Sequence, residues 1–264
     1  MQAEFHLRRE RTNQLEYGWG TKANRSIHFH SQIEIYFVLE GEIGVWINDK
    51  YRLLHANEIS VSFSYDAHGY REETPSRFAY LVVPTDLLHE FLPMFTERQT
   101  GDPFISDPEI FQKAYAAFCE IPTGANELAV RGYVYVILGI LSACLPLEVR
   151  VDLREPRSLA RLLMYINEHF RGELTLTDLA AAFGYNPSYL SRNFRETFGI
   201  SFSRYVTMLR LREAILLLGD GGRSITACAL ESGFGSLRSF YRAFYDEFHC
   251  TPTEYLHAGE KKQI

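Results

Sequence analysis

Two similar stretches in the C-terminal part decide the fold: Gly184-Tyr-Asn-Pro-Ser-Tyr-Leu-Ser-Arg-Asn-Phe-Arg-Glu-Thr-Phe-Gly199 and Ser232-Gly-Phe-Gly-Ser-Leu-Arg-Ser-Phe-Tyr-Arg-Ala-Phe244. They belong to a longer internal repeat. Its matches are 49 residues apart at first and 50 apart after one inserted residue: Thr175 with Ser224, Gly184 with Gly233, Arg192 with Arg242, Phe194 with Phe244, Phe198 with Phe248 and Tyr205 with Tyr255. Because two copies are too few for a solenoid, the repeat predicts a duplicated helical unit.

Each copy has the pattern of a helix-turn-helix. In the first copy, a short helix over 179–183 ends at Gly184, since glycine accepts the positive φ of a helix C-terminus. The next helix starts at Asn186-Pro187, an N-cap residue followed by proline. Apolar residues at every fourth position predict its buried face: Leu190, Phe194 and Phe198.

The opposite face of each second helix carries hydroxyls and arginines, which suit the DNA major groove. Hydroxyls allow close approach, and arginine pairs with guanine through two hydrogen bonds. The expected base contacts are Ser188, Ser191, Arg192, Arg238, Ser239 and Arg242. For any single arginine a solvated surface is the alternative, but the recurrence of arginine at one repeat position favours DNA. Residues 202–218 predict a helix of about 25 Å that joins the two units.

Charge is unevenly distributed along the 264 residues, whose net charge is −6. Residues 1–155 hold 14 basic and 22 acidic residues, net −8, and residues 156–264 hold 13 and 11, net +2. The second part is only mildly basic, so the DNA hypothesis depends on where its arginines lie. A hydrophobic content of 46% is globular and excludes a disordered chain.

The N-terminal part predicts short antiparallel strands, as in a sandwich or barrel. Apolar runs over 33–39, 43–47 and 50–54 are separated by tight turns. Helices are expected from Asp107-Pro108 to Glu120 and over 126–145. The predicted class is α+β with two domains. We expect an effector-binding and dimerisation domain over 1–145, a charged, proline-bounded linker over 146–156, and an all-α DNA-binding domain over 157–264.

The repeat closely resembles the DNA-binding domain of the AraC/XylS family of transcription regulators, over about 157–258. The resemblance implies two helix-turn-helix units joined by a linker helix, double-stranded DNA and RNA polymerase as partners, and most often activation by a small effector. It places base contacts on the six residues above, and phosphate contacts are expected from Arg195, Arg204 and Arg210. Leu237 departs from the pattern, because many members have a polar reader there.

A histidine motif marks the N-terminal part: His28-x-His30-x-x-x-Glu34. Strand periodicity puts these side chains on one face, and His68 is expected to join them from a later strand. The spacing resembles the first motif of the cupin barrel, whose enzymes bind a divalent metal through such residues. The match is partial. The first cupin motif expects glycine where this chain has Lys22, and the second expects Gly-Asp where this chain has Asn57-Glu58. We therefore predict no metal and no cofactor, and keep these four residues as the alternative metal ligands.

We expect the N-terminal domain to be a cupin-like sensor and not an enzyme. Polar groups among aromatic walls suit a small ligand such as a sugar. The predicted effector pocket is lined by His30, Glu34, Tyr36, Trp19, Trp46, Tyr65 and Tyr80. The alternatives are a constitutive regulator whose barrel only dimerises, a regulator controlled by a partner protein, and a metal-binding cupin with residual catalytic activity.

The predictions of localisation and assembly follow from four further features. An apolar stripe on 126–145 either pairs subunits in a homodimer or packs on its own barrel: Leu128, Val136, Ile137, Ile140, Leu141 and Cys144. The longest apolar run, 133–145, is shorter than the about 20 residues that a bilayer requires, and no secretory signal is evident. Four cysteines without a Cys-x-x-Cys motif fit a reducing compartment. We predict a cytoplasmic protein without a membrane partner.

Overall fold

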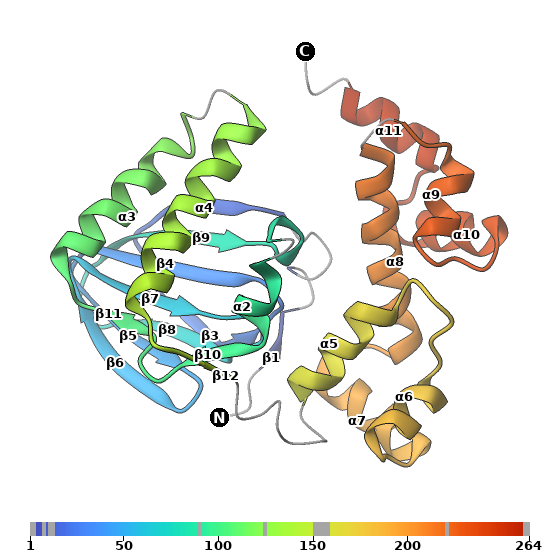
Figure 1. Ribbon diagram of the computed structural model, residues 1–264, viewed down its shortest axis with the longest axis horizontal. Helices are drawn as coiled ribbons and strands as arrows, with labels where there is room; N and C mark the ends of the chain where they lie inside the picture. The colour runs from blue at the N-terminus through green and yellow to red at the C-terminus, as the bar shows by residue number, and fades with distance from the viewer. Residues whose placement is uncertain are drawn as a thin grey trace. The chain divides into compact units, whose positions relative to one another are not determined.

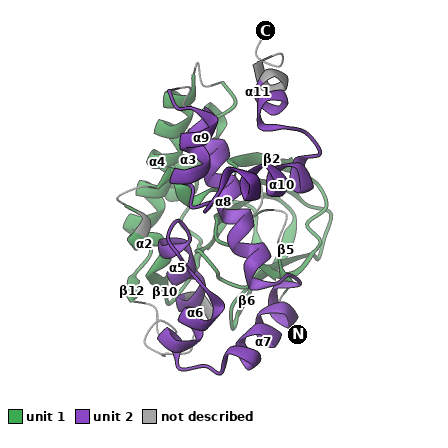
Figure 2. Ribbon diagram, turned by 90° about the vertical axis from the view of Figure 1, so that its right-hand side faces the viewer, with its two compact units in different colours: residues 1–154 green, residues 155–264 purple. Residues whose placement is uncertain are grey.

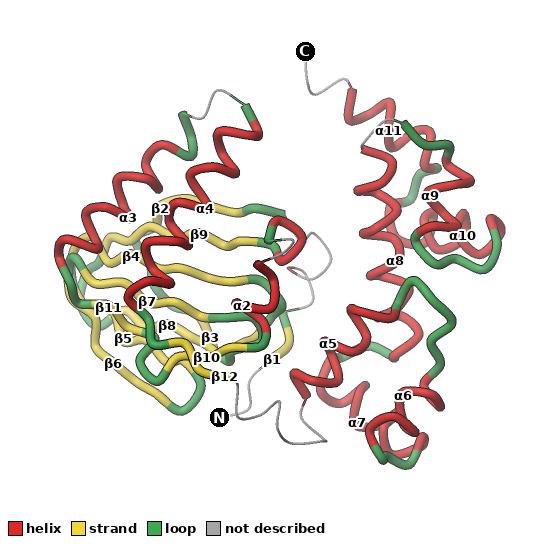
Figure 3. Tube along the Cα trace, viewed as in Figure 1, coloured by secondary structure: helices red, strands yellow, loops and turns green. Residues whose placement is uncertain are grey.

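The computed structural model describes residues 4–6, 9, 14–88, 91–123, 126–149, 159–219 and 222–260. The chain divides into two compact units, residues 1–154 and 155–264 (Figure 2). In the described residues the first unit combines β-sheets with helices, and the second is helical (Figures 1 and 3). The predicted two-domain α+β class is therefore confirmed.

Two five-stranded sheets form the frame of the first unit. One has the order β1 (Glu4–Phe5), β3 (Arg25–Phe29), β8 (His68–Glu72), β5 (Glu42–Ile47) and β6 (Lys50–His55). The other has the order β11 (Phe104–Ile105), β7 (Glu58–Ser62), β4 (Ile33–Glu40), β9 (Arg77–Val83) and β2 (Glu16–Gly20). These sheets are antiparallel except where β1 pairs with β3. The described strands form no closed barrel, so the predicted cupin-like barrel is not confirmed.

Strand β4 is buried on both faces, which explains its almost continuous apolar sequence. On one face of β4, Ile33, Ile35 and Phe37 pack in a core with two helices, α3 (Pro108–Glu120) and α4 (Glu127–Cys144). These helices lie over this sheet in Figure 1. The intervening residues Tyr36 and Val38 belong to a second core with strands of both sheets. By the same alternation, the Glu34 side chain lies on the face of Tyr36.

The two helices on the sheet begin where the sequence predicts. The Asp107 carboxylate accepts hydrogen bonds from two backbone N–H groups of α3, and Pro108 occupies the first position. Asn126 caps α4 by accepting the Ala129 N–H. By length and composition alone, the 18 residues of α4 could cross a membrane, which the shorter apolar run of the sequence did not indicate. The inner face of α4 is buried in the sheet core, as in a helix that covers a sheet.

The predicted linker is wrong in its first part, because residues Leu147–Val149 form strand β12. This strand pairs antiparallel with β10 (Arg98–Thr100) and thus belongs to the first unit. A three-residue strand in a charged segment is too short to show alternation. Residues 150–156 of the predicted linker lie outside the described residues. Other short elements were not predicted either, among them η1 (Thr85–Leu87) and α2 (Leu92–Thr96).

The second unit contains the duplicated helices that the repeat predicts. Its helices are α5 (Leu159–His169), α6 (Leu176–Phe183), α7 (Pro187–Phe198), α8 (Phe202–Gly219), α9 (Ile225–Glu231), α10 (Leu237–Phe248) and α11 (Pro252–Glu260). Figure 1 shows α6 and α7 near one end of α8, and α9 and α10 near the other. Gly184, Gly199 and His249 end helices with φ of 66°, 70° and 55°, as expected for left-handed C-terminal residues.

Both copies bury the same stripe and use similar caps. On α7 the buried residues are Leu190, Phe194 and Phe198, and on α10 they include Phe240 and Phe244. The second helix of each pair starts at a capping side chain, Asn186 in the first copy and Ser236 in the second. The buried face of each of these helices is therefore fixed, and with it the face that solvent reaches.

Candidate DNA-binding surface and sensor site

The solvent face of α7 carries the predicted readers of the first copy. Ser188, Ser191 and Arg192 are exposed, opposite the buried phenylalanines. On α10, Arg238 and Arg242 are exposed in the same way. Within the part of the chain that the structure describes, none of these arginines makes an ion pair. Their guanidinium groups are thus available to an anionic partner.

Ser239 differs from the other predicted readers. It is half-buried, and its Oγ donates a hydrogen bond to the Ser236 carbonyl at 2.7 Å. It also lies 3.1 Å from the Ser236 Oγ, which caps the helix. A base contact by Ser239 competes with these local bonds. The neighbouring Leu237 is 36% exposed and presents an apolar side chain at the start of α10.

The three arginines predicted to contact phosphates have different surroundings. Arg195 is exposed on α7. The Arg204 guanidinium forms a close ion pair with Glu247. Arg210 donates hydrogen bonds to the Phe170 carbonyl at 2.7 Å and to the Gly172 carbonyl at 2.8 Å, which ties the end of α5 to α8. Arg204 and Arg210 thus have partners inside the unit, and Arg195 remains the best placed for a phosphate.

In the first unit a cavity of about 630 Å³ is lined by both sheets. The Tyr36 ring stacks at 4.2 Å on Tyr70 and at 4.4 Å on Phe78, which makes an aromatic wall. Lys22 and Arg25 also line the cavity. Burial raises the pKa of the Tyr36 and Tyr70 hydroxyls above the ordinary value, so both remain protonated at neutral pH.

The cavity includes only part of the predicted effector pocket. Of the seven predicted pocket residues, Glu34, Tyr36 and Tyr80 line it. His30 is fully buried, and its Nε2 lies 3.5 Å from the Glu34 Oε2. Tyr65 lies in a turn with φ of 63°, and its N–H donates to the His30 carbonyl.

Both tryptophans lie outside this cavity lining, contrary to prediction. Trp19 is 48% exposed, and its indole N–H donates to the Tyr115 hydroxyl of α3 at 3.1 Å. Trp46 packs on Tyr51 with the Arg71 guanidinium above it. Since Val45 faces the core between the sheets, alternation turns Trp46 to the other side of β5. Sequence reasoning missed Tyr70 as a wall residue, although it stands two positions after His68 on one strand face.

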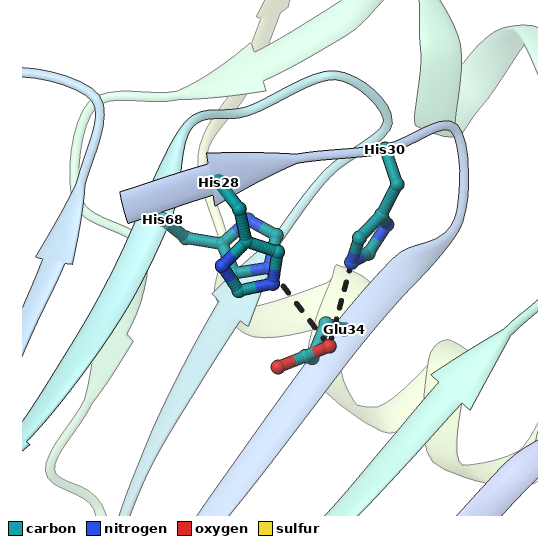
Figure 4. A group of neighbouring side chains, drawn as sticks. All are labelled: His28, His30, Glu34 and His68. Carbon is teal, nitrogen blue, oxygen red and sulfur yellow. Dashed lines mark ion pairs between the residues drawn. The ribbon is translucent and has the colours of Figure 1, made fainter. Parts of the chain in front are cut away.

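Three imidazoles and one carboxylate converge beside the cavity (Figure 4). His28 on β3 pairs directly with His68 on β8, and His30 follows at the end of β3. The Glu34 Oε2 lies 3.5 Å from the Nε2 of His30 and 3.8 Å from the Nε2 of His68. All four side chains are buried, and their ligand atoms lie within 4.8 Å of one another. The structure therefore brings together all four alternative metal ligands.

Backbone carbonyls fix the hydrogen on each of these imidazoles. The Nδ1 atoms of His28, His30 and His68 lie 2.9, 3.2 and 2.8 Å from carbonyl oxygens. Because a carbonyl only accepts, Nδ1 carries the hydrogen and Nε2 presents a lone pair. Burial lowers the pKa of His28 to about 3 and of His30 to about 4, so both are neutral at pH 7. The three Nε2 atoms have no hydrogen-bond partner in the described residues.

Glu34 supplies a negative charge at the centre of this cluster. Burial alone raises the pKa of its carboxyl, but contacts with His30, His68 and Arg9 outweigh burial and hold the pKa well below its usual range. The nearest Arg9 nitrogen lies 3.2 Å from the Glu34 Oε2. Three lone pairs and an ionised carboxylate thus face one another, which is an arrangement that a cation stabilises.

The donor set fits a divalent metal ion. With bonds of about 2.0–2.2 Å, neighbouring ligand atoms stand roughly 3–4.2 Å apart, close to the separations found here. Imidazole and carboxylate suit zinc, iron or manganese. The carbonyl that holds each Nδ1 is also the usual outer partner of a metal-bound histidine, because it fixes the orientation of the ring.

The comparisons with known proteins agree with the geometry of the second unit. The family model of a helix-turn-helix domain matches residues 179–258. Uncharacterized helix-turn-helix transcriptional regulators of Staphylococcus aureus are 37% identical over 91 residues, 34% of this chain but only 12% of theirs. The uncharacterized regulator YfiF of Bacillus subtilis is 25% identical over 253 residues, which cover 89% of this chain and 80% of YfiF.

Solved structures are also similar. A DNA-binding transcriptional dual regulator of Escherichia coli is 30% identical and covers 39% of this chain and 91% of its own, with a TM-score of 0.36. ToxT of Vibrio cholerae, crystallised with an unsaturated fatty acid, is 12% identical. The match covers 92% of this chain and 94% of the ToxT chain, with a TM-score of 0.43.

The paired helices and the match to the family model show that the second unit contains a helix-turn-helix domain, similar to domains of transcription regulators. The matched part, residues 179–258, is a helix-turn-helix domain of the AraC type.

Proposed function

We propose that the protein is a cytoplasmic, homodimeric transcription activator that binds DNA through α7 and α10 and responds to a small effector in its first unit. The observation that carries this proposal is the pair of exposed guanidinium groups on Arg192 and Arg242, at the same position of the repeat. Matching readers in two copies suit one stretch of duplex that presents two major grooves.

In this proposal α8 sets the distance between the two readers. Its 18 residues span about 27 Å, close to the about 34 Å between successive major grooves on one face of DNA. The proposed base contacts are Ser188, Ser191, Arg192, Arg238 and Arg242. Ser239 contacts a base when its hydroxyl gives up the hydrogen bond to the Ser236 carbonyl. Arg195 contacts a phosphate, which positions the helix without reading sequence.

Effector binding in the cavity then alters the packing of α3 and α4, or of the segment after β12, and so changes how the readers engage DNA and RNA polymerase. The effector must bind the two states with different affinity, or it shifts nothing. We propose a cupin-like arrangement for this unit. The predicted apolar stripe on α4 divides: Ile137 and Leu141 are buried, whereas Leu128 and Val136 are exposed and form the proposed dimer contact.

The test is selection of DNA sites from a random library with the full chain, followed by footprinting. We expect protection of two major grooves about one helical turn apart on one face. The double variant Arg192→Ala/Arg242→Ala loses this pattern, and the control Arg131→Ala, at a half-buried arginine of α4 paired with Glu127, keeps it. Equal protection by both variants contradicts the proposal.

A second proposal concerns the histidine cluster: His28, His30, Glu34 and His68 hold one divalent metal ion. The converging ligand atoms support it, because in the described residues the three imidazole Nε2 atoms have no hydrogen-bond partner and face the Glu34 carboxylate. When bound, the metal supplies a Lewis acid that attracts an anionic oxygen. Elemental analysis after exposure to zinc, manganese or iron(II) should give about one equivalent per chain, and Glu34→Gln should lower it strongly. No retained metal under any of these conditions contradicts the proposal.

A further inference from the structure

We infer that the cavity of the first unit takes an organic carboxylate and discriminates against a neutral sugar. This inference rests on the proposed function, because it names the chemical class of the effector for the same cavity. It is carried by the basic side chains, hydroxyl donors and aromatic wall of the lining, and it does not require the metal ion.

The cavity has an excess of available positive charge. Lys22 and Arg25 line it, and neither has an ion-pair partner among the residues that the structure describes. The two acidic lining residues are Glu4 and Glu34. Glu34 already faces the Arg9 guanidinium at 3.2 Å and the imidazoles beside it. An anion brought into the cavity therefore finds two basic partners against the one remaining acidic residue, Glu4.

The hydroxyls of the cavity add hydrogen-bond donors. Tyr36, Tyr70 and Tyr80 all contribute to the lining. The Tyr70 side chain is 3% exposed, and its hydroxyl has no hydrogen-bond partner in the described residues. A carboxylate only accepts hydrogen bonds, whereas every sugar hydroxyl must also donate one. The three phenol groups can all donate to a carboxylate, and together with the positive charges of Lys22 and Arg25 they favour an anion over a neutral sugar.

The remaining wall suits the carbon part of such a ligand. Tyr36 lies between Tyr70 and Phe78 in a nearly parallel stack, with ring planes 17° and 23° apart. This flat apolar surface packs against a ring or a short chain. The volume of about 630 Å³ lies within the roughly 300–1,000 Å³ of small-ligand pockets. A small aromatic or short aliphatic acid therefore matches both size and polarity.

The experiment compares acids with their neutral counterparts. Thermal-shift and calorimetric titrations of the full chain use benzoate, phenylacetate and 2-oxoglutarate, then benzamide, phenylacetamide, L-arabinose and D-glucose. We expect at least one acid to bind, and to bind at least about tenfold more tightly than its amide or either sugar. Arg25→Gln with Lys22→Gln should weaken that acid about tenfold or more, whereas Arg77→Gln, an exposed arginine paired with Glu40, should leave it unchanged.

Tyr70→Phe gives a second test that keeps both charges and removes one donor. It should weaken acid binding without changing the melting temperature of the free protein. Sugar binding without acid binding, binding of none of the three acids, or acid binding that is indifferent to Arg25→Gln/Lys22→Gln overturns the inference. DNA binding of the same samples is measured separately, so failure of the proposed regulator appears as loss of site-specific binding by the wild-type chain.

Discussion

Arg192 is the residue at which sequence discrimination should be most sensitive. It is exposed on α7 and free of ion pairs in the described residues, so its guanidinium is available to a guanine. Arg192→Ala should cost about 1–3 kcal/mol of discrimination between the preferred site and its mismatches. Arg195→Ala should weaken binding to all DNA sequences alike, and it should reduce by about 1 the slope of the logarithm of the binding constant against the logarithm of the salt concentration. Anisotropy titrations at several salt concentrations measure both effects, and equal losses on every DNA contradict the assignment.

Arg210 should behave as a structural residue, unlike Arg195. Its two hydrogen bonds to the Phe170 and Gly172 carbonyls tie the end of α5 to α8. Arg210→Ala should lower the free energy of unfolding by about 1–3 kcal/mol, since charged hydrogen bonds are lost. The salt slope of DNA binding should not change. Urea unfolding and salt titration separate the two roles, and a reduced slope with unchanged stability favours the original phosphate prediction.

The buried histidines should make the stability of metal-free protein depend on pH. In the fold the pKa of His28 is about 3 and that of His30 about 4, below the ordinary 6.5. Between about pH 6.5 and 4 the unfolded chain therefore binds more protons, and the free energy of unfolding falls as pH falls. The slope is up to about 1.4 kcal/mol per pH unit for each histidine. Urea unfolding across this range should show it, and His30→Asn should flatten it; an unchanged slope contradicts the assignment.

At the scale of elements, the backbone at Gly233 in the second helix-turn-helix approaches closely the backbone at Arg171, just after α5. Its φ is +94°, and an added Cβ would lie 2.6 Å from the Arg171 carbonyl oxygen. Gly233→Ala should therefore destabilise by about 1–3 kcal/mol through strain and backbone displacement. Gly199→Ala is the matched control. Gly199 has a φ of +70° and open space around its Cβ position, so this substitution introduces backbone strain without a steric clash. Chemical unfolding should show the larger loss for Gly233→Ala, and equal losses would falsify the role of this contact.

Elements whose signals are local were predicted well. The caps at Asp107 and Asn186 and the glycine helix end at Gly184 lie within a few residues of the helices that they delimit. Strand β12 was missed because its partner β10 lies about fifty residues earlier. In the site, alternation predicts that His28, His30 and Glu34 converge. The direct pairing of His28 with His68 depends on sheet register, which one strand alone does not reveal.

At the scale of the whole molecule, α4 should decide the oligomeric state. Leu128 is 79% exposed and Val136 is 50% exposed on a helix whose other face is buried. Leu128→Asp should convert the proposed dimer to a monomer without unfolding it, because the charge must be desolvated in the contact. Leu230→Asp, at an exposed apolar position of α9, should leave the dimer intact. Sedimentation velocity measures both, and a dimer that survives Leu128→Asp places the contact elsewhere.

The double burial of β4 has a mechanical consequence. Neighbouring side chains on this strand point to opposite faces, so Tyr36 touches the cavity and Phe37 touches the aromatic cluster of α3. Rotation of the strand by a ligand on one side moves both sets together, since they share one backbone. Because β4 is hydrogen-bonded along both edges, to β7 and to β9, we expect a ligand that displaces Tyr36 to shift the helices that cover the opposite face of this strand.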